Sequence, residues 1–324
     1  MKNNLFSYSR FQANSLLELL RSHYALSPDA NCSYYVLGLH DNYLLTDRQE
    51  KYICRIYRSD WRTEEDILFE LDLLCFLEQQ DCSVVAPIKN TSGENFIVLD
   101  AAEGKRYAAL FPFANGYAPG KDLNSEQAAL LGFNIAKLHQ HGNKFVTQNQ
   151  RQTLNLDYLL DKSILSIRSY LTESDNQFIT CLAKKIRDNI SDLPATKPYY
   201  TVCTGDVNAS NFFINDDKEI RIFDFDQCGY GWRAFEIGKF NASISQYSNR
   251  QILLNAFIDG YQQHSRLNEV ELQSIPYFTL ISQLWVMAIH VYNVKMIGSK
   301  YLEADFWQRR ITILKNEENK LKSL

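Results

Sequence analysis

The sequence predicts an α+β protein in which a small antiparallel sheet precedes a larger, mainly helical region. Short apolar segments of strand character gather in the first third of the chain around one helical segment, Thr63 to Gln79. Longer segments with helical apolar spacing fill the remainder. Between them, Phe111 to Gly116 reads FPFANG and indicates a linker. We therefore expect one part at residues 1–113 and a second at residues 114–324.

Composition limits the function classes. The chain has 324 residues, 45% of them apolar, 22% charged, and a net charge of −4. Without a basic excess, no nucleic-acid partner is expected. Seven scattered cysteines form no Cys-x-x-Cys pair, so neither a disulfide framework nor a zinc site is indicated. Reduced thiols are typical of the cytoplasm, where we expect the protein.

No membrane association is expected either. The first residues, MKNNLFSYSRFQ, are polar and lack the apolar core of a signal peptide. The most apolar late stretch, Tyr277 to Tyr292, is interrupted by Ser282, Gln283 and His290. It is interpreted as too short to span a bilayer and as a buried helix.

In the first part, Ser15 to Tyr24 has the leucine spacing of a short amphipathic helix. Thr63 and Asp66 give the second helix a start resembling a capping box. Strands are expected over 34–45 (two strands about a turn), 51–57, 96–100 and 107–113. This order, strands around one main helix, predicts the antiparallel sheet.

In the second part, Ser125 to His141 has the strongest amphipathic pattern. His139 and His141 near its end suit a helix C-terminus and are given no catalytic role. Further helices are expected over 158–171, 177–190, 235–244, 251–264, 270–290 and 305–321. Pro194 and Pro198 interrupt the helical pattern before the next motif.

The stretch from Cys203 to Asp226 reads CTGDVNASNFFINDDKEIRIFDFD and predicts a loop, a strand, a turn and a second strand. Asp206 and Asn211 lie in the loop, and Asp224 follows the second strand. A hairpin would bring these three side chains towards one point. A surface hairpin with ordinary turn acids is the alternative, but the ordered set of polar residues with aliphatic residues between them favours a site.

This arrangement suits metal-assisted phosphoryl transfer. That reaction needs an acid to orient an attacking hydroxyl and oxygen ligands for Mg²⁺. Asp-x-x-x-x-Asn followed by Asp-Phe is the order of the catalytic and metal-binding loops of protein kinases. Asp206 is accordingly predicted as the base, and Asn211 and Asp224 as the Mg²⁺ ligands.

The segments TGDVNASNFFI and IFDFDQCGYGWRAFEIGKF resemble the aminoglycoside phosphotransferase and choline kinase family of small-molecule kinases. The resemblance implies a two-lobed, protein-kinase-like fold with ATP and Mg²⁺ between the lobes and the adenine at the linker, near Phe111 and Phe113. The chain departs from the family pattern at Thr204, where His is usual, and at Glu236, where Asp is usual. Thr204 lacks an imidazole, which puts the support of the loop in question.

The resemblance also implies a phosphate-binding Lys on the third strand, a position that Arg55 occupies. Its planar, permanently charged head can bind phosphate oxygens. Arg58 is a competing candidate. Glu70, on the helix Thr63 to Gln79, is predicted to pair with Arg55. The first turn has one glycine, Gly38, so the local signal for a phosphate-binding loop is weak.

The candidates for binding the acceptor are Asp226, Trp232, Arg233 and Trp285. The resemblance places the run from Gly229 to Glu236 beside the substrate. For Arg233 the alternative is a structural anchor, and for Trp285 it is core packing. Amino sugars, amino alcohols and hydroxy amino acids all remain open as acceptors.

The function expected is therefore ATP-dependent transfer of the γ-phosphoryl group to a hydroxyl of a small molecule. A kinase of protein Ser or Thr is one alternative, although no activation segment ending in Ala-Pro-Glu is recognisable. A non-catalytic nucleotide-binding regulator is the other, favoured by Thr204 and Arg55 and disfavoured by the retained Asp206, Asn211 and Asp224.

Overall fold

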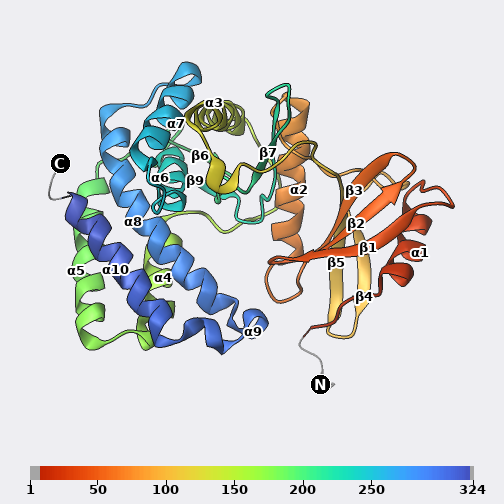
Figure 1. Ribbon diagram of the computed structural model, residues 1–324, viewed down its shortest axis with the longest axis horizontal. Coiled ribbons are helices and arrows are strands. Elements are labelled where there is room, and N and C mark those ends of the chain that lie inside the picture. The colour runs from red at the N-terminus through yellow and green to blue at the C-terminus, as the bar shows by residue number, and fades with distance from the viewer. Residues whose placement is uncertain (1–7, 322–324) are drawn as a thin grey trace. The chain divides into compact units, whose positions relative to one another are not determined.

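A computed structural model describes residues 8–321, which form two compact units (Figure 1). The first holds the described chain up to Gly116 with Val146–Arg151 and Asn215–Phe223. The second holds the rest, with Tyr117 as its first residue. The division of the main chain falls a few residues beyond the expected boundary at 113, and two short later segments belong to the first unit.

The first unit is built on a five-stranded antiparallel sheet in the order β1-β2-β3-β5-β4. Side chains alternate between its faces, so Tyr43, Leu45, Cys54 and Ile56 are buried on one side and contact the leucines of α1. The predicted α+β class is confirmed by this sheet. The strands and α1 are β1 (Asn31–Leu37), β2 (Asp41–Asp47), β3 (Glu50–Ile56), β4 (Ile97–Ala101), β5 (Gly104–Pro112) and α1 (Ala13–His23).

Helix α2 (Glu64–Gln79) begins at the predicted capping box. The Thr63 hydroxyl accepts the Asp66 backbone N–H at 3.2 Å, and the Asp66 carboxylate accepts the Thr63 backbone N–H at 3.0 Å. Two N–H groups that have no helical partner are thereby satisfied. The buried face of α2 includes Glu70, a carboxylate with no solvent exposure among leucines and a phenylalanine.

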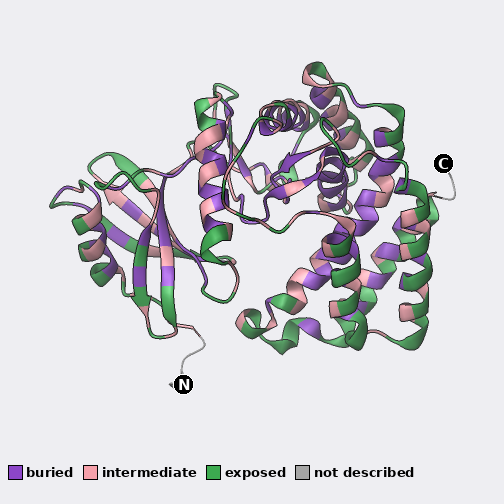
Figure 2. Ribbon diagram, turned by 180° about the vertical axis from the view of Figure 1, so that it is seen from behind, coloured by how far each residue is buried: buried purple, intermediate pink, exposed green. Residues whose placement is uncertain are grey.

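The second unit is mainly helical, with short strands near its polar motif. Figure 2 shows exposed residues along the outer turns of its helices and buried residues where the helices face one another. Its principal elements are α3 (Ser125–Gly142), α4 (Ser163–Ile167), α5 (Glu173–Ile190), β6 (Tyr200–Cys203), β7 (Phe212–Ile214), β9 (Gly229–Trp232), α6 (Arg233–Ser243), α7 (Arg250–His264), α8 (Glu269–Tyr292), α9 (Val294–Ile297) and α10 (Ala304–Leu321).

Helix α6 is buried on nearly all sides, with ten of its eleven residues in the buried class. A helix surrounded by protein is normally apolar throughout. This one carries Arg233, Glu236, Lys239 and Asn241 in the interior. Because a buried polar group without a partner is costly, each of these side chains must be paired, and α6 is the helix whose partners define the site.

Helix α8 corrects one expectation about length. The prediction that this apolar stretch is too short to cross a membrane is wrong. The helix spans 24 residues and is long and apolar enough to do so, judged by length and composition alone. In the most apolar window, 67% of it is buried inside the protein. Burial, and not shortness, makes α8 a core helix as predicted.

Helices α3 and α7 approach closely at two glycines. A Cβ atom on Gly260 would lie 1.9 Å from the Ala129 carbonyl oxygen, and one on Gly132 would lie 2.1 Å from the Phe257 carbonyl oxygen. Real Cβ atoms do not come so near backbone atoms. The absence of side chains at these two positions therefore sets the distance between the helices.

We expect Gly260→Ala to lower the melting temperature by about 5 °C, because overpacking forces the two backbones apart. In an open helix the same change would raise stability by about 1 kcal/mol, so the sign of the effect is diagnostic. Differential scanning calorimetry measures it. Asp259→Ala, at the neighbouring exposed position of α7, is the control and should leave the melting temperature within about 1 °C.

Candidate functional site

The predicted strand–turn–strand motif is present. β7 leads into a turn in which Asn215 accepts the Glu219 backbone N–H through its side chain at 2.8 Å and donates its own N–H to the Glu219 carbonyl oxygen at 3.1 Å. β8 (Ile220–Ile222) follows, and Asp224 comes two residues after its end. Asparagine closes this turn because its short amide can satisfy backbone groups nearby.

In the second unit, the pairing of β6 with β9 brings two distant segments together. The strands are antiparallel with Cys203 opposite Gly229. The residues that follow Cys203 and those that precede Gly229 therefore leave the ladder at the same end. The loop of Asp206 and the segment of Asp226 both lie there, which the sequence alone did not reveal.

Gly205 allows these segments to touch. Its φ is +81°, in the left-handed region that favours glycine, and a Cβ atom would lie 2.0 Å from the Gln227 carbonyl oxygen. The conformation and the close approach each exclude a side chain. The position of the residue before Asp206 is thus fixed by the backbone of the segment that follows Asp226.

Asp206 and Asn211 are in direct contact, as the hairpin hypothesis expects. The Asn211 side-chain amide nitrogen donates to the Asp206 carbonyl oxygen at 2.9 Å and to its carboxylate Oδ2 at 3.0 Å. Both bonds use the amide nitrogen of Asn211, and neither uses its amide oxygen, the kind of atom that ligates hard cations. An amide oxygen next to a carboxylate is chemically suited to a divalent cation.

Asp224 has a left-handed backbone conformation, with φ of +64°. That region is uncommon for residues other than glycine, and aspartate and asparagine tolerate it best. Strained conformations of this kind concentrate at functional sites. Arg48, Asp81 and Lys218 also have positive φ, so the conformation is compatible with a role for Asp224 without singling it out.

Glu236 holds the start of the loop that carries Asp206, the predicted base. Its buried carboxylate accepts three hydrogen bonds: from Thr204 N–H at 2.8 Å, from the Thr204 hydroxyl at 3.1 Å, and from Gly205 N–H at 2.8 Å. Charge-assisted bonds of this type are about twice as strong as neutral ones. Thr204, which raised doubt in the sequence, is itself a donor in this arrangement, so the loop is supported without an imidazole at that position.

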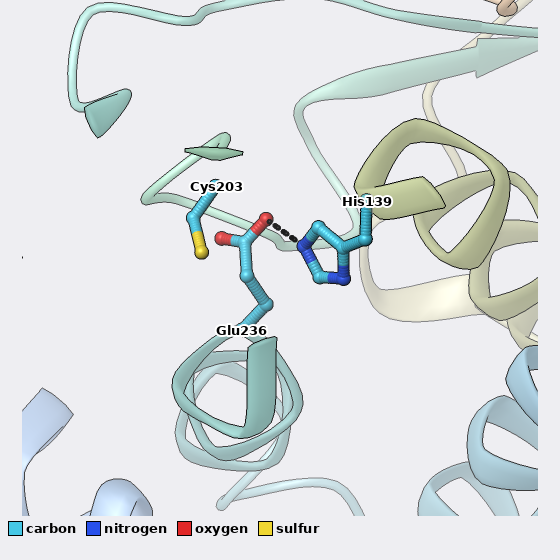
Figure 3. A group of neighbouring side chains, drawn as sticks. All are labelled: His139, Cys203 and Glu236. Atoms are coloured by element: carbon cyan, nitrogen blue, oxygen red, sulfur yellow. Dashed lines mark ion pairs between the residues drawn. The ribbon is translucent and has the colours of Figure 1, made fainter. Parts of the chain in front are cut away.

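An imidazole does approach the loop, but from α3. Figure 3 shows His139 facing Glu236, with its Nε2 3.4 Å from a Glu236 carboxylate oxygen. The His139 Nδ1 lies 2.7 Å from the buried Tyr261 hydroxyl, whose pKa is raised by burial. His139 was predicted to have no catalytic role, because a histidine near the C-terminal end of a helix suits that position. Nothing in the neighbouring sequence indicates Glu236 as its contact.

His139, Cys203 and Glu236 place one possible metal-ligating atom each within 4.8 Å of one another (Figure 3). Burial raises the pKa of the Cys203 thiol well above its ordinary value, so the thiolate that a metal needs is disfavoured. The Cys203 thiol donates a hydrogen bond to the Trp232 carbonyl oxygen at 3.6 Å. The Glu236 carboxylate already accepts hydrogen bonds from Thr204 and Gly205. We interpret this group as a hydrogen-bond network.

Lys239 contacts the predicted base directly. It lies one helical turn after Glu236 on the same face of α6. Its Nζ forms an ion pair with the Asp206 Oδ1, and its side chain is only 7% exposed. Lys239 is not among the residues predicted from the sequence, because a single lysine in a helical pattern does not indicate which residue it pairs with.

In the first unit, the predicted pairing of Arg55 with Glu70 is present. Nη1 of Arg55 lies 3.0 Å from Oε1 of the fully buried Glu70. The guanidinium carbon is 5.4 Å from the centre of the Phe111 ring, within the range of a cation–π contact. Arg58, the competing cation, forms an ion pair with Asp60 at 2.6 Å.

Phe113 lies at the end of β5, where its backbone N–H donates to the Lys51 carbonyl oxygen at 2.9 Å. Its half-buried ring is one wall of a pocket of about 290 Å³ in the first unit. The remaining lining is Glu78, Val84, Val85, Pro112, Ala114, Asn115, Asn215, Glu219 and Arg221. Residues of the linker that was predicted to hold the adenine therefore line a pocket.

Of the four acceptor candidates, Asp226, Arg233 and Trp285 are buried and Trp232 is partly buried. Asp226 is 1% exposed and accepts the Gln227 side-chain amide at 2.9 Å. Trp232 donates to the Pro194 carbonyl oxygen at 3.1 Å. Arg233 is paired with Glu271, which is the geometry of the anchoring alternative.

Trp285 is 2% exposed in a hydrophobic cluster, where its ring contacts Tyr158 and Phe235 at 6.4 and 6.0 Å between ring centres. That position corresponds to the core-packing alternative. Direct binding of the acceptor by these four side chains stays a prediction, and the contacts described favour structural roles for Trp232, Arg233 and Trp285.

Comparison with known proteins gives consistent results. The sequence model of the phosphotransferase enzyme family (APH) matches residues 37–270. The chain is 35% identical over 306 residues to the Synechocystis protein sll1119, covering 94% of this chain and 85% of that protein. It is 22% identical to the amicoumacin kinase of Bacillus subtilis, covering 78% of each chain.

A solved structure with a similar fold is the microcompartment-associated aminopropanol kinase, with a TM-score of 0.80, 20% identity, and coverage of 96% of this chain and 98% of that one. The extent of the family match and the identity to the Synechocystis protein lead to one conclusion. The chain belongs to the phosphotransferase enzyme family and is a kinase-like phosphotransferase.

Proposed function

We propose that this protein uses Mg·ATP to phosphorylate a hydroxyl of a small molecule that also carries an amine, with Asp206 as the base. Phosphotransferase activity follows from the family; the roles of the residues and the acceptor are our inference. The observation that carries the proposal is the Asp206–Asn211 contact on a loop held at its start by Glu236. Together these contacts fix a carboxylate and an amide oxygen at one place in the second unit.

The chain's own residues would act by position and charge. Asp206 would orient the acceptor hydroxyl and accept its proton. Asn211 and Asp224 would hold Mg²⁺, which, when bound, supplies charge neutralisation for the phosphate oxygens. Arg55, oriented by Glu70, would bind phosphate oxygens, and Phe111 and Phe113 would contact the base of the nucleotide. Such catalysis depends on preorganisation more than on covalent chemistry.

The proposed acceptor class is supported by the relatives. One of them is named as an amicoumacin kinase and another as an aminopropanol kinase. Amino alcohols, amino sugars and hydroxy amino acids are therefore the compounds to test first. The cysteines are scattered along the sequence and form no Cys-x-x-Cys pair, which supports our proposal of a reducing, cytoplasmic location. The Thr204–Glu236 bonds weaken one of the two arguments for a non-catalytic site, the absence of an imidazole at position 204.

The test is ADP release coupled to a spectrophotometric readout, with Mg·ATP and a panel of these compounds. We expect ADP release that depends on one class of acceptor. Release that no panel member stimulates, with a phosphorylated protein acceptor found instead by mass spectrometry, would contradict the small-molecule assignment.

Asp206→Asn should lower kcat by roughly two to four decades, because the amide cannot accept the hydroxyl proton. It keeps an oxygen that accepts from Lys239, so the protein should still fold and bind Mg·ATP. Steady-state kinetics and nucleotide binding by calorimetry measure the two effects. Asp216→Asn, at an exposed position of the adjacent turn, is the matched control and should retain wild-type turnover.

Asp224→Asn should raise the Mg²⁺ concentration needed for half-maximal activity by about tenfold or more, because a charged ligand becomes neutral. Asparagine tolerates the left-handed conformation, so the effect is isolated from backbone strain. A Mg²⁺ titration of activity at saturating ATP provides the measurement. An unchanged titration curve would show that Asp224 does not bind the metal.

A further inference from the structure

Lys239 is a buried cation whose ion pair is with the predicted catalytic base. Its residue is 5% exposed overall, and Nζ pairs with Asp206 Oδ1. Within residues 8–321, no second carboxylate forms an ion pair with this ammonium group. The side chain reaches the base from α6, which also supplies Glu236 to the same loop.

Stability gives no reason for this placement. Transfer of an ammonium group out of water costs several kcal/mol, and replacement of a buried ion pair by apolar side chains is often neutral or stabilising. Leu, Met or Ile at position 239 would suit a helix whose other faces pack against Phe278 and neighbouring apolar residues. The presence of a buried cation at this position therefore indicates a role in the reaction.

Two groups bind the Asp206 carboxylate, and Lys239 is one of them. Lys239 binds Oδ1 of the carboxylate, and the Asn211 amide nitrogen binds Oδ2 at 3.0 Å. Each carboxylate oxygen has two lone pairs, so each retains one for the acceptor hydroxyl. The Asp206 side chain is 30% exposed, whereas that of Lys239 is 7% exposed. Two donors from different segments thus fix the plane of the carboxylate while its outer side stays accessible.

We propose that Lys239 is a positioning residue for the phosphoryl transfer, which holds the Asp206 carboxylate in the orientation that receives the acceptor hydroxyl. This inference rests on the proposed function, in which Asp206 is the base. In this proposal Lys239 acts through Asp206, the carboxylate with which its buried ammonium group forms an ion pair. Its effect must therefore appear in turnover and disappear when Asp206 is replaced.

The kinetic test is a double-mutant cycle with Lys239→Met, which keeps the length of the side chain and removes the charge. We expect Lys239→Met to lower kcat by about 10- to 100-fold, as a misplaced base does, with KM for Mg·ATP within about twofold of the wild type. In an Asp206→Asn background the same change should alter kcat by less than about threefold. A purely structural lysine would not produce this dependence on Asp206.

The stability test is a second cycle, which needs no substrate. Asp206→Ala should lower the melting temperature by about 5 °C, because the ammonium loses its partner, and adding Lys239→Met should restore most of that loss. Lys239→Met alone should change it by less than about 2 °C. Asn241→Leu removes another buried polar group from α6, bonded to Thr279, and serves as the control: it should lower stability without lowering kcat.

Three results would overturn the proposal. Turnover of Lys239→Met within twofold of wild type would show that the pair does not position the base. An equal loss of kcat in the Asp206→Asn background would show that Lys239 acts independently of Asp206. Additive melting temperatures would show that the ion pair does not form. Failure of the proposed function is a different result, namely a wild-type protein without acceptor-dependent ADP release.

Discussion

The carboxylate of Glu236 is the contact on which the rest of the site depends. Glu236 lies on α6, and its side chain has no solvent exposure. Its carboxylate accepts hydrogen bonds from two backbone N–H groups and one hydroxyl of the loop that precedes Asp206. A buried carboxylate is costly unless it is fully hydrogen-bonded, so the loop and the helix require each other. The position of the base is therefore determined by the interior of the second unit and not by the loop itself.

The same helix connects the loop to its surroundings through further buried pairs. Arg233 binds Glu271 at the start of α8, and Asn241 binds Thr279. On the opposite side of Glu236, His139 is joined to Tyr261, which links α3 and α7. These paired polar groups explain how a helix with charged residues can lie in a core.

Part of the site was readable from the sequence because its signal is local. The spacing of Asp206 and Asn211 places both in one loop, and their contact is present. The pairing of Arg55 with Glu70 was also expected, from strand and helix patterns that each carry one charge. His139 and Lys239 were missed for the opposite reason. Each lies in an ordinary helical pattern, and its partner belongs to another element.

The sequence by itself determined the class of fold, the strands and single main helix of the first unit, the capped start of α2 and the strand–turn–strand motif. These features depend on periodicity, turn residues and spacing, which act over a few residues. Only the tertiary structure decided which faces meet: the ladder that sets Cys203 opposite Gly229, and the helix that carries Lys239 to Asp206. Burial and charge pairing between distant segments are long-range quantities, and no local pattern encodes them.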